Sequence, residues 1–329
     1  MRDFCVEGRN IRAYQAACAI IKVQVRWTEQ IMYFKQHFIV IILCNLVLLG
    51  SALGQPPRTI DSDPGNTSFV LFEPGQEKWQ GELKTAITTY QNESGIQLDL
   101  VATIHIADSD YFAELNQYFK GRDAVLYELV ADADVRPSPD LIQSSSSSVG
   151  FLQQMLANFL GVAFQLEHVD YSPQNFIHAD LDPASLAEIM QAKGENFLSM
   201  FISLALAEMA NQQLDSATGA SNSAFNLVSI MDAFSATDQR SAFKTLFAEE
   251  LARSGGVLTD PSLGNQLTIL GDRNRVALQV LRDTLRDSTR RRVSIFYGAA
   301  HMPGIEQEIV GQMGFTQVSQ QWLTAWAIP

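Results

Sequence analysis

The sequence predicts an α/β (or α+β) protein: a central mixed β-sheet with flanking helices and one large helical insertion. Three observations predict this fold. Apolar runs separated by turn residues fill residues 66–130, and strand patterns return after residue 292. Between them a helical pattern extends from about 149 to 285, with breaks at 167–182, 216–223 and 254–263. The order is therefore sheet, insertion, sheet, within one domain that covers residues 55–329.

Three candidate strands begin this domain. Residues 66–73 form the first, and the runs 81–90 and 96–106 follow it, separated by the turn-rich segment Gln91–Gly95. The run 96–106 is the more apolar of the two, which is typical of a central strand. The short break between these runs predicts a hairpin.

A β-helix-β order comes next and is typical of an α/β sheet. Asp108 and Asp110 begin a helical pattern that continues to about Lys120, and residues 123–130 are a further candidate for a buried strand. A serine run at 144–148 lacks any pattern of a nucleophile and is typical of a connector.

The sheet patterns return at the end of the chain. Residues 292–300 predict a strand, 304–313 a helix, and 315–328 one or two closing strands. The last strands therefore complete a sheet that the insertion at about 149–285 interrupts.

The N-terminal extension, residues 1–54, differs from the rest of the chain. A short basic stretch at 35–37 precedes the apolar run 38–49, and small residues follow. These are the parts of a secretory signal peptide, and the run is shorter than the about 20 residues of a spanning helix. The pattern favours export, to a periplasm or the cell exterior. A signal anchor at residues 38–53 is the alternative.

Removal of this segment makes the chain strongly acidic. Of 23 Lys/Arg and 36 Asp/Glu, six basic and three acidic residues lie in 1–54, which leaves 17 basic and 33 acidic residues in 55–329. A net charge near −16 argues against nucleic acid as a partner. The three cysteines, Cys5, Cys18 and Cys44, are also in the removed part, so the exported domain offers no thiol nucleophile.

Three predicted strand ends carry groups suited to chemistry. His105 and His301 each follow an apolar strand, and Glu128 interrupts a third. Sites in α/β proteins lie at the carboxyl ends of strands, and two imidazoles with one carboxylate can bind a divalent metal. Each histidine taken singly also fits a structural role.

Four segments carry a family resemblance. They are Thr103–His105, Tyr127–Glu128, Asp272–Asn274 and Gly298–Gly304. Together they resemble the motifs of the TraB/GumN/TIKI (TraB/PrgY-like) family: a repeated G-x-x-H, a strand glutamate, and an arginine near a helix start. The resemblance covers roughly Phe69 to Gly314. Ala102 departs from it by replacing the first motif's glycine, which crowds a close backbone approach there.

The resemblance implies a mixed α/β fold and, by analogy with TIKI members, a metal-dependent hydrolase that acts as a metallopeptidase. It implies that His105 and His301 are metal ligands and that Glu128 is a ligand or general base. Arg273 would orient a carboxylate or stabilise an oxyanion. The implied cofactor is a divalent ion, manganese or cobalt, and the implied partner is a peptide or small-molecule substrate.

Two alternatives stay open from the sequence. His178 and Asp180 could provide a further ligand, or Asp180 could cap a helix that begins near Pro183; the structural interpretation is favoured. Asn274, beside Arg273, is a further accessory candidate. A non-enzymatic protein that sequesters a peptide or small ligand is the alternative function, because a binding site can retain the same histidines.

Overall fold

The computed structural model describes residues 68–132, 134–137, 159–193, 227–257 and 268–329. The predicted signal or anchor segment at 1–54 and the serine run at 144–148 lie outside these residues. Within the described ranges, no helix has the length and apolar character that a membrane crossing requires.

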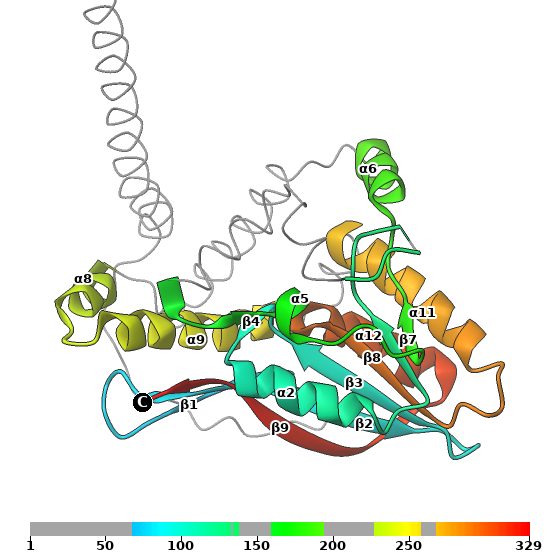
Figure 1. Cartoon of the computed structure of the whole chain (residues 1–329), viewed down its shortest axis with the longest axis horizontal. Helices are drawn as coiled ribbons and strands as arrows, with labels where there is room; N and C mark the ends of the chain where they lie inside the picture. The colour runs from blue at the N-terminus through cyan, green and yellow to red at the C-terminus, as the bar shows by residue number, and fades with distance from the viewer. Residues whose placement is uncertain (1–67, 133, 138–158, 194–226, 258–267) are drawn as a thin grey trace, which may run out of the picture. The chain divides into compact units, whose positions relative to one another are not determined.

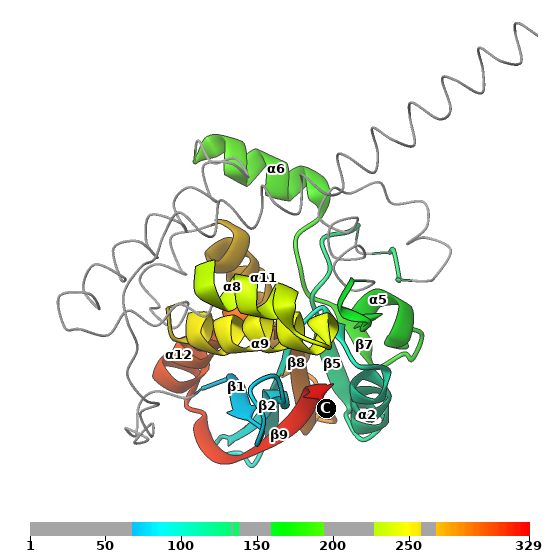
Figure 2. The same ribbon diagram turned by 90° about the vertical axis from the view of Figure 1, so that its left-hand side faces the viewer.

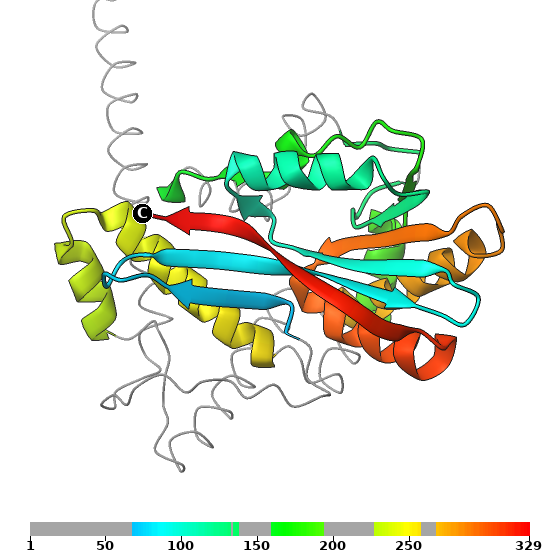
Figure 3. The same ribbon diagram turned by 90° about the horizontal axis from the view of Figure 1, so that it is seen from below.

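A seven-stranded mixed sheet forms the centre of the domain (Figure 1). Its strands are β1 (Val70–Pro74), β2 (Gly81–Gln91), β3 (Gln97–Thr103), β5 (Ala124–Tyr127), β7 (Phe176–His178), β8 (Arg292–Gly298) and β9 (Thr316–Ile328). The order is β1-β2-β3-β8-β5-β7, and β9 pairs with β2 along its length, as Figure 3 shows. The β3, β8, β5 and β7 strands are parallel, whereas β1, β2 and β9 pair antiparallel. The predicted mixed sheet is confirmed.

The helices of the described part are α2 (Ser109–Phe119), α5 (Gln165–His168), α6 (Pro183–Ala192), α8 (Leu227–Ser235), α9 (Gln239–Val257), α11 (Arg273–Thr284) and α12 (Met302–Met313). A π-helical turn (Thr268–Asp272) precedes α11, and a 3-10 turn (Ala299–His301) precedes α12. One face of the sheet is covered by α2 and the other by α11 and α12 (Figures 1 and 2). The domain is therefore layered as helix, sheet and helix.

Alternation along β3 shows how the sequence builds these layers. Leu98, Leu100 and Ala102 belong to one buried cluster with apolar residues of α11 and α12, whereas Val101 lies outside that cluster and is also buried. Side chains on a strand alternate between faces, so a strand that is buried at successive positions is covered on both sides.

The insertion differs in part from the helical pattern predicted at 149–285. Its described part contains two strands, β6 (Ala163–Phe164) and β7, and β7 pairs with β5 through Val125 and Phe176. β7 falls in the break predicted at 167–182, whereas β6 lies where helix was predicted, because a two-residue strand carries too little periodicity to be recognised. The insertion thus contributes an edge strand to the parallel part of the sheet.

The predicted strand 96–106 is divided in two. Its first part, β3, ends at Thr103, and the second, β4 (Ile106–Ala107), pairs with β6 in a separate two-stranded ribbon. The chain thus leaves the main sheet after Thr103. His105 therefore lies in the turn between the strands.

Candidate functional site

Three parallel strands, β3, β8 and β5, have their carboxyl ends side by side at one end of the sheet. The register places Thr103 at the end of β3 beside Gly298 at the end of β8, and Tyr127 at the end of β5 beside Phe296. The residues that follow these strands meet at this edge, which we call the carboxyl rim. Such a rim is where α/β proteins gather groups from separate strands.

Five polar side chains at this edge form what we call the rim cluster. They are His105, Glu128, Asp180, Arg273 and His301. Arg273, Asp180 and His301 are buried, and the side chain of Glu128 is 8% exposed. Buried charge is costly unless it is paired, so the contacts of these groups decide what the cluster can do.

Arg273 is the cation of the rim cluster. As the first residue of α11, it donates from Nε and Nη2 to the two carboxylate oxygens of Asp180, at 2.9 and 2.6 Å. The same Nη2 donates to Oε1 of Glu128 at 2.7 Å. Burial lowers the pKa of Arg273, but Asp180 and Glu128 outweigh burial and raise it. The guanidinium therefore stays charged and holds two carboxylates together.

Glu128 is ionised at neutral pH. Burial alone raises the pKa of its carboxyl group, but the opposing effects of His301, Arg273 and His105 are larger together and bring the pKa well below its usual range. Its second oxygen, Oε2, accepts the main-chain N–H of Gly298 at 2.6 Å. Both oxygens of this carboxylate are thus fixed in direction.

The charges of the rim cluster do not balance. Glu128 and Asp180 bring two negative charges, whereas Arg273 brings one positive charge. With His105 and His301 neutral, one negative charge is left over in a site where unpaired charge is costly. A bound cation or a protonated imidazole would balance it.

Gly298 leaves space for the rim cluster. A Cβ at this position would lie 3.3 Å from Oε2 of Glu128 and 3.5 Å from Nε2 of His105. The φ of Gly298 is −53°, which any residue adopts, so the glycine serves space and not backbone conformation. Gly298, three residues before His301, thus lets the main chain approach both Glu128 and His105.

His301 is oriented by an amide. Its Nδ1 lies 2.7 Å from Oδ1 of Asn274, whose Nδ2 donates to the carbonyl oxygen of His301 at 3.3 Å. An amide oxygen only accepts, so Nδ1 carries a hydrogen, and in the neutral imidazole Nε2 then carries the lone pair. That Nε2 lies 3.5 Å from Oε1 of Glu128 and 3.5 Å from Nη1 of Arg273.

His105 is oriented in the same way by a residue that sequence analysis missed. Its Nδ1 lies 3.1 Å from Oε1 of Gln165, whose Nε2 donates to the hydroxyl of Tyr171 at 2.9 Å. In the neutral imidazole, Nε2 of His105 therefore carries the lone pair, on the side of Gly298. Gln165 comes 60 positions after His105, and no local pattern connects the two.

The accessory candidates Asn274, Asp180 and His178 have different places in the structure. Asn274 orients His301, and Asp180 belongs to the rim cluster. His178, at the end of β7, has its Nε2 2.6 Å from the carbonyl oxygen of Leu129, which fits donation to the main chain and the structural role considered for it.

The favoured interpretation of Asp180 as a helix cap is wrong. The N-cap of α6 is Asp182, which accepts from the main-chain N–H groups of Ala184 and Ser185 at 2.9 Å each. Asp182 directly precedes Pro183, the first helical residue, where a cap belongs. Asp180 lies outside the helix and is left to pair with Arg273.

Two ion pairs attach both ends of the α6 segment to consecutive residues. Asp180, before the helix, pairs with Arg273, and Lys193, after it, pairs with Asp272. The helix between them lies away from the sheet in Figure 2, and Met190 is its buried residue. The contacts at its two ends therefore position α6 beside the rim cluster.

The donor set of the carboxyl rim fits a divalent metal in kind. His105 and His301 each direct an Nε2 lone pair toward the region of Glu128, and each is held through Nδ1, as metal-binding histidines are. Among the described residues, no three His, Cys, Asp or Glu side chains already have a metal-binding arrangement. Oε1 of Glu128 is instead bound to Arg273.

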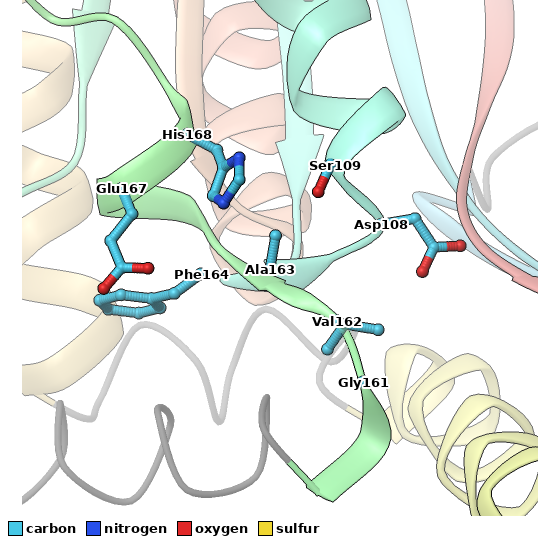
Figure 4. Close-up of a pocket in the computed structure, with 8 residues that line it drawn as sticks. All are labelled: Asp108, Ser109, Gly161, Val162, Ala163, Phe164, Glu167 and His168. Carbon is cyan, nitrogen blue, oxygen red and sulfur yellow. The ribbon is translucent and has the colours of Figure 1, made fainter.

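A separate pocket of about 320 Å³ lies beside the start of α2 and the β4–β6 ribbon (Figure 4). Asp108 and Ser109 line it together with residues 161–164, Glu167 and His168. None of the rim cluster is among its lining residues. Asp108 is also paired with Lys244 of α9, at 3.0 Å. The pocket is therefore distinct from the site at the carboxyl rim.

Comparison with known proteins finds no match for this chain, whether to a family model, a curated protein or a solved structure.

Proposed function

We propose that the rim cluster is the active site of a metal-dependent hydrolase of the TraB/GumN/TIKI kind that cleaves peptide bonds. One observation carries the proposal. Nε2 of His301 lies 3.5 Å from the Glu128 carboxylate and Nε2 of His105 lies on the same side of Gly298, in a buried site where two carboxylates share one guanidinium. Imidazole nitrogens with a carboxylate and excess negative charge are what a divalent cation requires.

In this proposal His105, His301 and Glu128 hold the ion, which is manganese or cobalt by the family resemblance. A bound divalent ion supplies a Lewis acid and lowers the pKa of a water molecule. Glu128, ionised at neutral pH, accepts a proton from water or remains a ligand. Arg273 keeps the Glu128 carboxylate in place through Nη2.

Thermal unfolding with and without Mn²⁺ or Co²⁺ tests the metal site. A cation that binds the native state alone raises the unfolding midpoint, by an amount that follows its concentration relative to Kd. We expect this rise in the parent protein and its loss in His105→Ala and His301→Ala. His178→Ala is the matched control and should keep the rise, because His178 bonds to the main chain at Leu129.

Peptide hydrolysis is tested separately on the metal-loaded protein. Incubation with a mixture of peptides, followed by mass spectrometry, should reveal new termini with the parent and none with Glu128→Gln. An equal metal-induced rise of the unfolding midpoint in the parent and in both histidine variants would refute the proposed metal site. Metal binding without cleavage of any peptide would instead favour a protein that sequesters its ligand.

A further inference from the structure

Both rim histidines are held through Nδ1 by a side-chain amide, although the two amides come from unrelated parts of the chain. Asn274 of α11 holds His301, and Gln165 of the insertion holds His105. An amide oxygen accepts the imidazole hydrogen without adding charge to a cluster that already has one excess negative charge. The pair of amides therefore sets the direction of two lone pairs at once.

We propose that Gln165 is a positioning residue that fixes His105 as the tautomer with hydrogen on Nδ1. This tautomer leaves the lone pair of Nε2 on the side of Gly298 and Glu128. The opposite tautomer would direct an N–H to that side and could not bind a cation there. The consequence for metal affinity rests on the proposed function, whereas the tautomer itself does not.

The β4–β6 ribbon gives Gln165 its place. The pairing of Ile106 with Phe164 puts His105 and Gln165 opposite each other, and the main-chain N–H of Gln165 donates to the carbonyl oxygen of His105 at 2.8 Å. A shift of the register by one residue would turn the amide to the other face of the ribbon. Main-chain pairing thus brings the two side chains together.

The amide of Gln165 cannot turn freely. Gln165 is 2% exposed, its Nε2 donates to the Tyr171 hydroxyl, and its Oε1 also accepts from Thr103 Oγ1 at 3.5 Å. Exchange of the amide oxygen and nitrogen would place an N–H against the hydrogen of His105 Nδ1. Burial holds the amide in place, and the Thr103 hydroxyl, which donates to Oε1, favours the orientation with the oxygen toward the imidazole.

The nitrogen-15 NMR spectrum of the imidazoles tests the proposal on the metal-free full chain. At a pH where His105 is neutral, the parent should show hydrogen on Nδ1 and a bare Nε2. In Gln165→Leu the acceptor is gone, so we expect His105 to shift toward the form with hydrogen on Nε2. Gln165→Met, which also lacks the amide oxygen, answers the same question where the leucine variant does not fold.

Two matched variants separate positioning from packing. Gln165→Glu keeps an acceptor for Nδ1–H and should keep the parent tautomer. Tyr171→Phe removes the other bond of the Gln165 amide and should also keep it, because Oε1 stays the acceptor. A parent tautomer that persists in folded Gln165→Leu or Gln165→Met overturns the proposal, as does its loss in Gln165→Glu.

Metal titration of the same proteins measures the consequence. Loss of an outer partner of a ligating histidine typically weakens metal binding about 10–100-fold. We expect Gln165→Leu to bind Mn²⁺ or Co²⁺ more weakly by such a factor and Gln165→Glu to restore part of it. A parent that binds no metal would refute the proposed function while the tautomer comparison still decides the role of Gln165. Unchanged affinity in Gln165→Leu, with metal bound by the parent, would refute the positioning role alone.

Discussion

The two ends of the parallel strands both bury a carboxylate beside a guanidinium, yet they differ in charge balance. At the amino end, Arg122 pairs with Asp99 through Nη1 and Oδ2 at 3.2 Å. At the carboxyl end, Arg273 pairs with Glu128 and Asp180 together. One guanidinium thus meets one carboxylate at the amino end and two at the carboxyl rim.

The amino-end cluster is balanced and built from structural contacts. Asp99 is fully buried and accepts from Thr89 Oγ1 at 2.7 Å and from Gln97 Nε2 at 3.0 Å. The Arg122 guanidinium lies 4.1 Å from the ring centroid of Tyr118. Burial and the charge of Asp99 raise the pKa of Tyr118, so its phenol stays neutral. These contacts join β2 and β3 to the end of α2.

The two clusters differ in charge balance and in the residue types that take part. At the amino end each charge has its opposite, and no histidine takes part in these contacts. At the carboxyl rim two carboxylates share one guanidinium, and the Nε2 atoms of two imidazoles lie beside them. Burial and ion pairing alone would not separate these two clusters, whereas charge balance does.

Replacement of Arg273 and of Arg122 should produce the largest difference in stability between the two clusters. Arg273→Met leaves two buried carboxylates without their cation and should lower the free energy of unfolding by about 3–5 kcal/mol. Arg122→Met leaves one buried carboxylate, that of Asp99, without its cation and should lower the free energy of unfolding by less. Urea unfolding at neutral pH measures both. Added Mn²⁺ should restore part of the loss in Arg273→Met and none in Arg122→Met. A greater loss in Arg122→Met would contradict the comparison.

Acid should affect the carboxyl rim through Glu128. Its pKa is lowered by folding, so its contribution to stability is complete above the unfolded value of about 4.3 and is lost as pH falls through the folded pKa. Below about pH 4.3 the unfolded chain binds a proton there and the folded chain does not. Glu128→Gln should therefore reduce the pH dependence of the free energy of unfolding by up to about 1.4 kcal/mol per pH unit. Unfolding of the parent and of Glu128→Gln is measured at a series of pH values across this range. Equal slopes of the free energy of unfolding against pH in both proteins would exclude a contribution from Glu128.

A methyl group at Gly298 should have the smallest effect on stability. Gly298→Ala places a Cβ 3.3 Å from Glu128 Oε2 and should cost about 1 kcal/mol while weakening the metal-induced rise in midpoint. Gly311→Ala, in α12 with no atom within 4 Å of its Cβ, is the control and should stabilise by about 0.5–1 kcal/mol with the rise unchanged. Equal rises in the two variants would show that the space at Gly298 is not used.

The sheet and three members of the rim cluster were predictable from local patterns. The run 81–90 corresponds to β2, and His105, Glu128 and His301 follow from their places after apolar strands. Parallel strands bring such places together, which is why positions far apart in sequence could be predicted to meet.

The remaining contacts depend on pairings that sequence does not specify. Asp180 and Arg273 lie 93 positions apart, and their bond depends on where the insertion returns to the sheet. Gln165 meets His105 through strands of two residues, too short for any periodic signal. The N-cap of α6 could have been predicted from the sequence, because Asp182 stands directly before Pro183.

The attachment of α6 at both ends has a consequence for how this protein can vary. Asp180 and Lys193 fix the segment to Arg273 and Asp272, so the positions of its ends do not depend on the residues between them. The helix itself buries little beyond Met190. Replacement or lengthening of its exposed middle leaves the charges at the carboxyl rim in place. The exposed middle of α6 can therefore change in sequence without a change in the contacts of the rim cluster.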